Sequence, residues 1–363
     1  MARPLLPSVN GSYIQATAQD ALIANGFNML QLSVLDQSVA IAGRPQAESI
    51  RDTLATAEVA EALGYKRFWV AEHHNHDTIA GSAPEILMAA IAARTSKIRI
   101  GSAGVMLPHY SAYKVAEQFR VLDALAPGRI DLGVGRAPGS DGHTAFALNP
   151  NAARAHEQFP AAVRDLMAWT SGSPLAEGHP FQNIRAFPSG DTSPTVWMLG
   201  TSDYGAQCAA HFGMPYCFAH FITDGGGVAR ALDVYRRNYQ PSEAHPEPCV
   251  ALCVWAIAGA TEAEADHLFI PRAHWKATRD RGQLTPVQSP EALANFKYYG
   301  SEKLRMEQLR KDAICGTAGE VGDKLRALAE EHDVDEIVVL TWSHDPDAKR
   351  RSYELLAREF GMI

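Results

Sequence analysis

The sequence predicts an α/β fold: a (β/α)8 TIM barrel with insertions over the carboxyl ends of its strands. Short apolar segments alternate strictly with longer amphipathic ones, a pattern that specifies a parallel sheet connected by helices. The alternation occurs eight times, which is the number of strands that closes such a barrel. The first strand is also not followed by the G-x-G-x-x-G turn of an open dinucleotide-binding sheet.

The first half of the chain contains four predicted strand–helix units. The first helix has an apolar face and ends at Gly64, and the second begins with Pro84 in its first turn. The third strand is unusual because residues 101–104 are all small, which lets a ligand or another backbone approach closely. The predicted strands are 30–35, 67–71, 98–106 and 130–134, and the predicted helices are 47–63, 84–94, 113–125 and 153–170.

The second half of the chain repeats the pattern but includes two long excursions. Residues 172–194 are rich in Gly, Pro, Ser and Asp. Residues 261–315 hold helical fragments broken by Pro271, Pro286 and Pro290, and we expect them to cover the barrel mouth. The predicted strands are 195–199, 214–219, 250–257 and 336–341. Two predicted helices end at His211 and Tyr239, and two more span 320–331 and 347–360.

Composition and charge restrict the class of protein. The 363 residues are 46% hydrophobic, enough for a large core, and the net charge of -8 argues against nucleic acid or an anionic membrane as a partner. The 5 cysteines include no C-x-x-C pair, which predicts free thiols in the reducing cytoplasm. No segment resembles an export signal or a membrane span of ~20 apolar residues. We predict an N-terminal extension, residues 1–28, and one barrel domain, residues 29–363.

Polar residues and glycines gather at the ends of the predicted strands. In a barrel of this type the ligand lies over the carboxyl ends of the strands, so these positions form the candidate site. They are Asp36, Glu72, His73, His74, residues 102–104, Gly135, Arg136, residues 200–202, His220 and Thr341.

One group of these residues is typical of a phosphate site. Thr201 and Ser202 lead directly into a helix, whose first N–H groups can bind an anion. Tyr204 and Gly205, in the first turn, can add a hydroxyl and an N–H. Arg136 follows the fourth strand in a glycine-flanked loop, where a guanidinium can reach an anionic ligand. The alternatives are a serine that only caps its own helix and an arginine in an ordinary salt bridge.

A second group is the run from Glu72 to His76, at the end of the second strand. A histidine here can act as a general acid or base, because its pKa lies near working pH. Adjacent side chains on a strand point in opposite directions, so at most one of His73 and His74 faces the cavity. The alternatives are histidines hydrogen-bonded in a loop, or a metal site of His74, His76 and His220 as in barrel hydrolases. The eighth strand lacks the metal carboxylate of those hydrolases, so we predict no metal.

Four segments resemble the bacterial-luciferase-like flavin-dependent monooxygenases. They are GYKRFWVAEHH, KIRIGSAGVMLP, LDALAPGRIDLGVGRAPG and LGTSDYGAQCAAHFGMPYCFAHF, and they occur in the order and spacing of that family. The resemblance covers the chain from about residue 30 to residue 360. It implies a (β/α)8 barrel that binds FMN over the strand ends.

The phosphate residues of the family match positions already singled out. By the resemblance, Arg136, Thr201 and Ser202 contact the FMN phosphate, and Tyr204 or Gly205 supports them.

The ring of the flavin is expected over the third strand. Ala103 and Gly104 match a small pair beneath the isoalloxazine ring, which in this family is often joined by a non-prolyl cis peptide bond. His73 matches the catalytic histidine at the reactive face of the flavin.

Three positions depart from luciferase. Gly135 stands in place of a cysteine, Thr201 in place of a glutamate, and Ser111 in place of a histidine, with His109 two residues earlier as a substitute. These differences argue against light emission and long-chain aldehyde substrates, and they leave flavin binding intact.

The function that the resemblance implies is an FMN-dependent monooxygenase, which uses reduced flavin and O2 on a small organic substrate. NAD(P)H reduces the flavin either directly or through a separate flavin reductase. The alternatives are an F420 (deazaflavin)-dependent hydride-transfer enzyme, a non-catalytic flavin-binding protein and, more remotely, the metal-dependent barrel hydrolase. By resemblance we also expect a homodimer that pairs through the helices beside the early strands.

Overall fold

Eight parallel strands close into a barrel in the computed structural model, which describes residues 30–279 and 281–363. The strands follow one another around the ring in chain order, and the last pairs with both β7 and β1. The predicted (β/α)8 fold is therefore confirmed, whereas the predicted extension at residues 1–28 lies outside the described residues. The barrel strands are β1 (Gln31–Asp36), β2 (Arg67–Val70), β3 (Arg99–Met106), β4 (Ile130–Gly135), β5 (Thr195–Gly200), β6 (Tyr216–Phe218), β7 (Val250–Gly259) and β9 (Glu336–Leu340).

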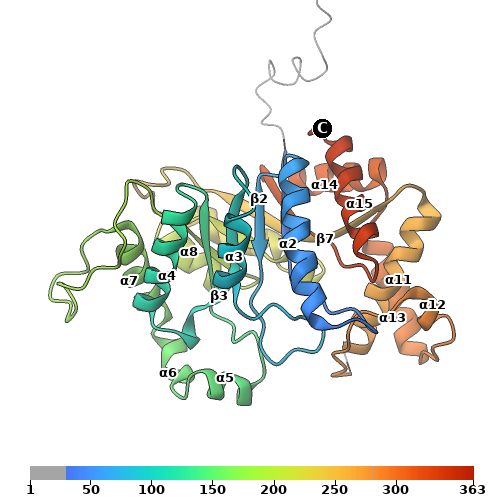
Figure 1. Ribbon diagram of the computed structural model, residues 1–363, viewed down its shortest axis with the longest axis horizontal. Helices are drawn as coiled ribbons and strands as arrows, with labels where there is room; N and C mark the ends of the chain where they lie inside the picture. Colours follow the sequence, from blue (N-terminus) through green and yellow to red (C-terminus); the bar gives the residue numbers. More distant parts are fainter. Residues whose placement is uncertain (1–29, 280) are drawn as a thin grey trace, which may run out of the picture.

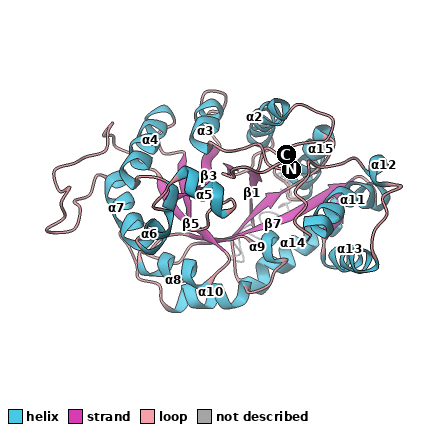
Figure 2. Ribbon diagram, turned by 90° about the horizontal axis from the view of Figure 1, so that it is seen from below, coloured by secondary structure: helices cyan, strands magenta, loops and turns pink. Residues whose placement is uncertain are grey.

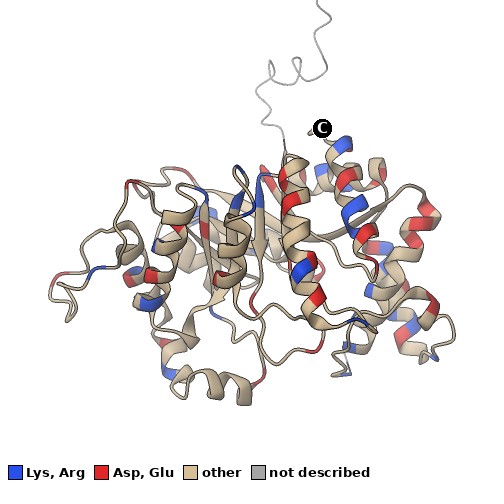
Figure 3. Ribbon diagram, viewed as in Figure 1, with Lys and Arg blue, Asp and Glu red and all other residues tan. Residues whose placement is uncertain are grey.

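Helices surround the barrel on its outer face, as Figure 2 shows in a view toward the carboxyl ends of the strands. Each crossover returns the chain to the start of the next parallel strand, which is why helix and strand alternate. Lys, Arg, Asp and Glu are mixed along the outer helices, most visibly on α2 and α15 (Figure 3). The outer helices are α2 (Gln46–Ala62), α3 (Pro84–Ala92), α4 (Ala112–Leu125), α7 (Phe159–Ser171), α8 (Asp203–His211), α10 (Val228–Arg237), α14 (Ala318–His332) and α15 (Pro346–Glu359).

The helix predicted over residues 153–170 is two helices, so this boundary was wrong. α6 (Ala152–Glu157) ends at Gln158, and α7 begins at Phe159 with Pro160 in its first turn. Proline lacks the N–H that would continue the preceding helix, but it suits the first turn of a new one. Together with α5 (Gly142–Leu148), α6 lies at the carboxyl end of the barrel, the lower side in Figure 1.

The excursion over residues 261–315 is more ordered than predicted. α11 (Glu262–Arg279) continues through Pro271 instead of breaking there, and α12 (Pro290–Leu293) and α13 (Gly300–Asp312) follow it. A ninth strand that the sequence did not predict, β8 (Ile314–Thr317), pairs with the last four residues of β7 beyond the barrel ring. The excursion thus lies to one side of the barrel, where α12 and α13 pack beside α11 (Figures 1 and 2).

The apolar core has two layers because side chains alternate along each strand. Val34 and Phe68 point outward and pack against helices, whereas Leu35 and Trp69 point into the barrel. The inner layer includes an edge-to-face pair of Trp69 and Trp197, with ring centroids 5.2 Å apart. In the described part of the chain no helix is long and apolar enough to cross a membrane.

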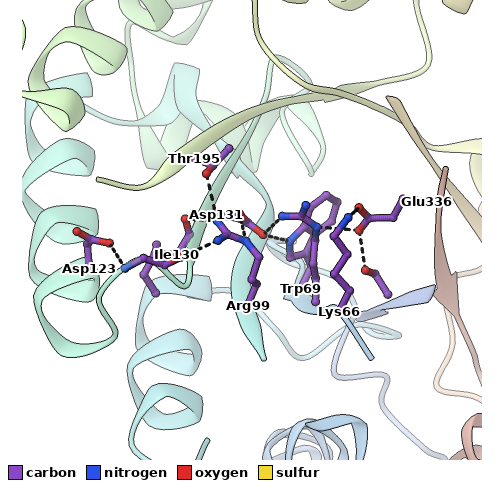
Figure 4. Close-up of polar contacts among 11 residues, drawn as sticks. Lys66, Trp69, Arg99, Asp123, Ile130, Asp131, Thr195 and Glu336 are labelled. Carbon is purple, nitrogen blue, oxygen red and sulfur yellow. Dashed lines mark hydrogen bonds and ion pairs between the residues drawn. The ribbon is translucent and has the colours of Figure 1, made fainter. Parts of the chain in front are cut away.

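The amino end of the barrel interior is closed by a buried ionic network (Figure 4). Asp131 is fully buried and accepts hydrogen bonds from Arg67 (2.8 Å), from the Trp69 indole (3.0 Å) and from Arg99 (2.6 Å). Arg67 also donates to Glu336 on β9 at 2.7 Å. Because this end of the interior is filled, a ligand can enter the barrel interior from the carboxyl ends of the strands.

Candidate active site

A cavity of about 740 Å³ opens at the carboxyl ends of the barrel strands. Its size lies within the range of small-molecule and cofactor sites. Five of the predicted strand-end positions do not line this cavity: Asp36, Glu72, Ser102, His220 and Thr341. The structure does bring to it all eight residues that were predicted to act in catalysis or to bind the cofactor. They are His73, Ala103, Gly104, Arg136, Thr201, Ser202, Tyr204 and Gly205.

Arg136 follows β4 and lies against the first turn of α8. Its guanidinium carbon is 3.6 Å from the centroid of the Tyr204 ring, so the two side chains stack. Arg136 forms no ion pair with any residue that the structure describes, which rules out the ordinary salt bridge considered above. Its charge therefore remains available to an anion in the cavity.

The start of α8 supplies hydrogen-bond donors beside this arginine. Ser202 caps the helix, because its hydroxyl accepts from the Gly205 N–H at 3.5 Å, but the same residue also lines the cavity. A Cβ placed on Gly200 would meet no atom within 4 Å. The cavity therefore reaches the backbone at the helix start, where N–H groups and the helix dipole favour an anion. We refer to Arg136, Thr201, Ser202, Tyr204 and Gly205 as the phosphate wall.

The small residues of β3 form another part of the lining. The Ala103–Gly104 peptide bond is cis, as the resemblance implied. The β3–β4 register shifts between Ser102 and Val105, and the Ser102 hydroxyl donates to the Gly133 carbonyl at 2.9 Å. A Cβ on Gly133 would lie 2.2 Å from the Ser102 carbonyl oxygen, so this approach requires glycine.

His73 lines the cavity with an unsatisfied ring nitrogen. Its backbone N–H donates to the Gly81 carbonyl at 3.0 Å, but its Nδ1 is buried with no hydrogen-bond partner in the described structure. Burial, followed by the nearby His76 and His74, lowers the pKa of His73 to about 4. The ring is therefore neutral at pH 7.

Glu72 orients His74. The sequence alone did not show whether Glu72 would orient His73 or His74. The Glu72 carboxylate is 1% exposed and accepts from His74 Nε2 and from the Tyr110 hydroxyl, both at 2.8 Å. It also accepts the Met106 N–H at 3.2 Å. Burial and then the Glu72 charge raise the pKa of Tyr110 well above its usual value. Tyr110 is therefore a neutral donor, and this group holds the chain beside His73 in place.

The other histidines considered in the sequence have different surroundings. His109 Nε2 donates to the Pro138 carbonyl at 2.7 Å, and Ser111 caps α4. Neither residue lines the cavity. His220 begins α9 (His220–Thr223) and is also absent from the lining. Within residues 30–279 and 281–363, no three His, Cys, Asp or Glu side chains are grouped to hold a metal ion.

One side of the cavity was missed by the sequence interpretation. Residues 261–315 were expected to cover the mouth, but no residue of that segment was assigned to the site. α11 in fact contributes four lining residues, which we call the α11 wall: Arg272, Trp275, Lys276 and Arg279. Positions 272, 276 and 279 share one helical face, so an uninterrupted helix through Pro271 would have indicated a basic stripe.

The sequence matches known proteins over most of its length. Residues 30–335 match the family model described as luciferase-like monooxygenase. An N-acetyl-S-alkylcysteine monooxygenase of Bacillus subtilis strain 168 is 37% identical, over 91% of this chain and 98% of that protein. A luciferase-like monooxygenase of Escherichia coli strain K12 is 36% identical, over 90% of this chain and 96% of that protein.

Solved structures share the fold. The crystal structure of apo-MsnO8 matches with a TM-score of 0.83 and 34% identity, covering 93% of this chain and 99% of that chain. The oxygenating constituent of 3,6-diketocamphane monooxygenase from Pseudomonas putida, in complex with FMN, matches at 0.68 and 17% identity, over 91% and 97%. An F420-dependent secondary alcohol dehydrogenase with an F420-acetone adduct matches at 0.66 and 15%, over 91% and 99%. At these two lower identities, the likeness shows the fold alone.

Proposed function

Because this chain belongs to the luciferase-like monooxygenase family, we propose that it is an FMN-dependent oxidoreductase that transfers one oxygen atom of O2 to a small organic substrate. The observation that carries the proposal is the phosphate wall: Arg136 has no ion pair with a described residue and lies against the start of α8. A cation next to free helical N–H groups suits a phosphate monoester such as that of FMN.

The rest of the cavity also fits a flavin. Ala103 carries only a methyl group and Gly104 carries no side chain, at a place where a flat ring needs close approach to the backbone. His73 brings an unpartnered buried nitrogen to the same cavity, and such a nitrogen is expected to find a partner in a ligand. These residues would hold FMN between the phosphate wall and β3.

The protein's own residues position, shield and move protons. Reduced FMN, when bound, supplies the two electrons with which O2 gives one oxygen atom to the substrate and the other to water. His73, neutral at pH 7, can accept a proton from the reacting groups or donate a hydrogen bond to the reacting oxygen. Glu72, His74 and Tyr110 fix the loop that carries it. Helix α11, which forms one side of the cavity, would help to exclude water from the reacting atoms.

Partners and substrate follow as further parts of the proposal. NAD(P)H supplies the electrons, directly or through a separate flavin reductase, and the enzyme works as a homodimer. A relative at 37% identity is named for N-acetyl-S-alkylcysteine, so thioethers of this type belong in the first substrate panel.

The test is an anaerobic titration of purified protein with FMN and with reduced FMN, followed by turnover in labelled O2 with the substrate panel. We expect FMN binding that Arg136→Ala weakens by about tenfold or more, since a charged hydrogen bond to phosphate is lost. Arg237→Ala is the matched control, because Arg237 is exposed on α10 and pairs with Asp233. The proposal predicts one labelled oxygen atom in the product.

Two other outcomes would contradict the proposed function. Binding of F420 in preference to FMN, with hydride transfer in the absence of O2, would indicate the deazaflavin-dependent alternative. Tight FMN binding without consumption of O2 or NADH across the panel would indicate a passive flavoprotein.

A further inference from the structure

Arg272 is a buried arginine without a polar partner. It lies on α11, is 6% exposed and sits between the main cavity, which it lines, and a smaller cavity of about 50 Å³ that Trp255 and Asp224 also line. Its guanidinium carbon is 4.5 Å from the centroid of the Trp255 ring, and it makes no hydrogen bond or ion pair with any described residue. A guanidinium carries five N–H donors and a fixed charge, and burying it without an acceptor is costly. Such a group indicates that a ligand supplies the acceptor.

The charged groups around Arg272 do not supply this hydrogen-bond acceptor. The nearby carboxylate, Asp224, already accepts from Lys276 at 2.7 Å and from Arg305 at 2.8 Å. Arg279 also lines the cavity and forms no ion pair with a described residue. Burial lowers the pKa of Arg272 to about 9, with Asp224 opposing this shift and Arg279 and Arg305 adding to it. Arg272 is still charged at pH 7, so the α11 wall carries an excess of positive charge.

This positive wall is separate from the phosphate wall. Arg136 follows β4, whereas α11 follows β7, and β5 and β6 lie between them in the ring. Helices α8 and α11 accordingly occupy different positions around the barrel in both views (Figures 1 and 2). One phosphate monoester bound at Arg136 therefore leaves the Arg272 donors unused.

The surface between Arg272 and β1 is aromatic. Trp275 and Trp342 both line the cavity and pack edge to face, with ring centroids 4.6 Å apart. Their indole N–H groups are already used, by Thr78 at 2.8 Å and by Gln37 at 2.9 Å. The remaining ring surface is apolar and suits a hydrocarbon or thioether group.

We propose that Arg272 is the anion subsite for the substrate, and that the substrate is an organic acid. Its carboxylate pairs with the Arg272 guanidinium, and its apolar body packs on Trp275 and Trp342. This inference rests on the proposed function, because it assigns the part of the cavity that FMN would leave free. It makes Arg272 a specificity-determining residue.

The experiment compares acids with their primary amides, which have nearly the same shape but no charge. Hexanoate, phenylacetate and (methylthio)acetate are titrated by calorimetry into protein saturated with oxidised FMN, and each amide is titrated in the same way. We expect at least one acid to bind about tenfold more tightly than its amide, the scale of one charged hydrogen-bonded pair. Arg272→Met should remove this preference, and Arg272→Lys should retain part of it.

Two further readouts separate a ligand role from a structural one. FMN affinity should stay within about threefold of wild type in Arg272→Met, whereas Arg136→Ala weakens it. Arg272→Met should also unfold at a temperature no lower than wild type, because the substitution removes a buried charge that has no partner. A structural arginine would give the opposite result.

The inference is overturned if no acid binds more tightly than its amide to the wild-type protein. It is also overturned if Arg272→Met weakens FMN binding as strongly as Arg136→Ala does, since the α11 wall would then serve the cofactor. If the wild-type protein binds no FMN, the titrations are repeated without it. An acid preference that depends on Arg272 would then support the subsite while the proposed function fails.

Discussion

The Arg136 guanidinium stacks on the Tyr204 ring, with its carbon 3.6 Å from the ring centroid. The contact joins the end of β4 to the first turn of α8, two elements that are separated in sequence by helices α5 to α7, the loop after them and β5. It orients the arginine through the face of an aromatic ring and leaves the charge without a counter-ion among the described residues. The site is thereby organised before an anion arrives.

The ring of Tyr204 should contribute to FMN affinity by holding Arg136. We expect Tyr204→Ala to weaken FMN binding by about fivefold, which corresponds to ~1 kcal/mol of cation–π interaction. Tyr204→Phe keeps the ring and should retain most of the affinity. A titration followed by flavin fluorescence measures both. Equal loss in the two variants would show that the hydroxyl, rather than the ring, is what matters.

His73 should affect turnover more than binding. We expect His73→Asn to lower kcat by about a hundredfold or more, the usual effect of removing a general acid or base. FMN affinity should change by less than about threefold. His143→Asn, at an exposed position on α5, is the matched control. Unchanged kcat in His73→Asn would remove this residue from the chemistry.

Stability should fall in acid because His73 resists protonation in the folded state. Its pKa is about 4 in the fold and 6.5 in the unfolded chain. The unfolded state therefore binds more protons between these values, and the free energy of unfolding decreases as pH falls from 6.5 towards 4. His76 and His220 are half-buried, and desolvation also lowers their pKa values, so they act in the same direction.

Denaturant unfolding measured between pH 7.5 and pH 4.5 checks the pH effect. His73→Asn should show a shallower decline with falling pH than wild type, and His143→Asn should follow the wild-type curve. Identical slopes in all three proteins would contradict the burial of His73.

The buried carboxylate of Asp131 should contribute several kcal/mol to the free energy of unfolding. Asp131→Asn leaves Arg99 without its carboxylate partner and Arg67 with Glu336 alone at the closed end of the barrel, and we expect the free energy of unfolding to fall by about 3–5 kcal/mol. Asp233→Asn, which breaks an exposed pair with Arg237 on α10, should cost less than about 1 kcal/mol. Urea denaturation of the two variants tests the contrast directly.

Gly133 should tolerate no side chain. A Cβ there would lie 2.2 Å from the Ser102 carbonyl oxygen, a backbone atom that cannot move aside without shifting β3. We expect Gly133→Ala to destabilise the protein by about 3 kcal/mol and to disturb FMN binding at Ala103 and Gly104. Gly142→Ala, where a Cβ meets nothing within 4 Å, is the control and should behave as wild type. A normal melting temperature in Gly133→Ala would contradict the close strand approach.

The sequence alone predicts the barrel because the signals for its strands and helices are local. Strand ends fall within two residues of prediction, since each strand is a short apolar run bounded by polar or glycine residues. β8 escaped prediction because four residues, Ile314–Thr317, carry no period of their own and pair only with the extended end of β7. Pro271 was taken as a break, but one missing N–H is tolerated where α11 packs on β7.

The same distinction separates the site residues that the sequence predicted from those that it did not predict. Residues with a motif, such as Arg136 and Ser202, were found because strand ends and helix starts define their place. Arg272 was not found from the sequence, because a basic residue on a predicted helix suggests a solvated face. Only the packing of α11 in the structure reveals that Arg272 is buried. The preference of Glu72 for His74 depends on side-chain directions that no spacing rule supplies.

The bond from Arg67 to Glu336 joins residues 269 positions apart. During synthesis on the ribosome, Arg67 and Asp131 emerge early and can pair, but the second carboxylate arrives only with the last barrel strand. Until then β1 and β7 are open edges with unpaired peptide groups, which are templates for aggregation. The ring can therefore close only after β9 has emerged, and a chain that terminates before β9 should be captured by chaperones or degraded.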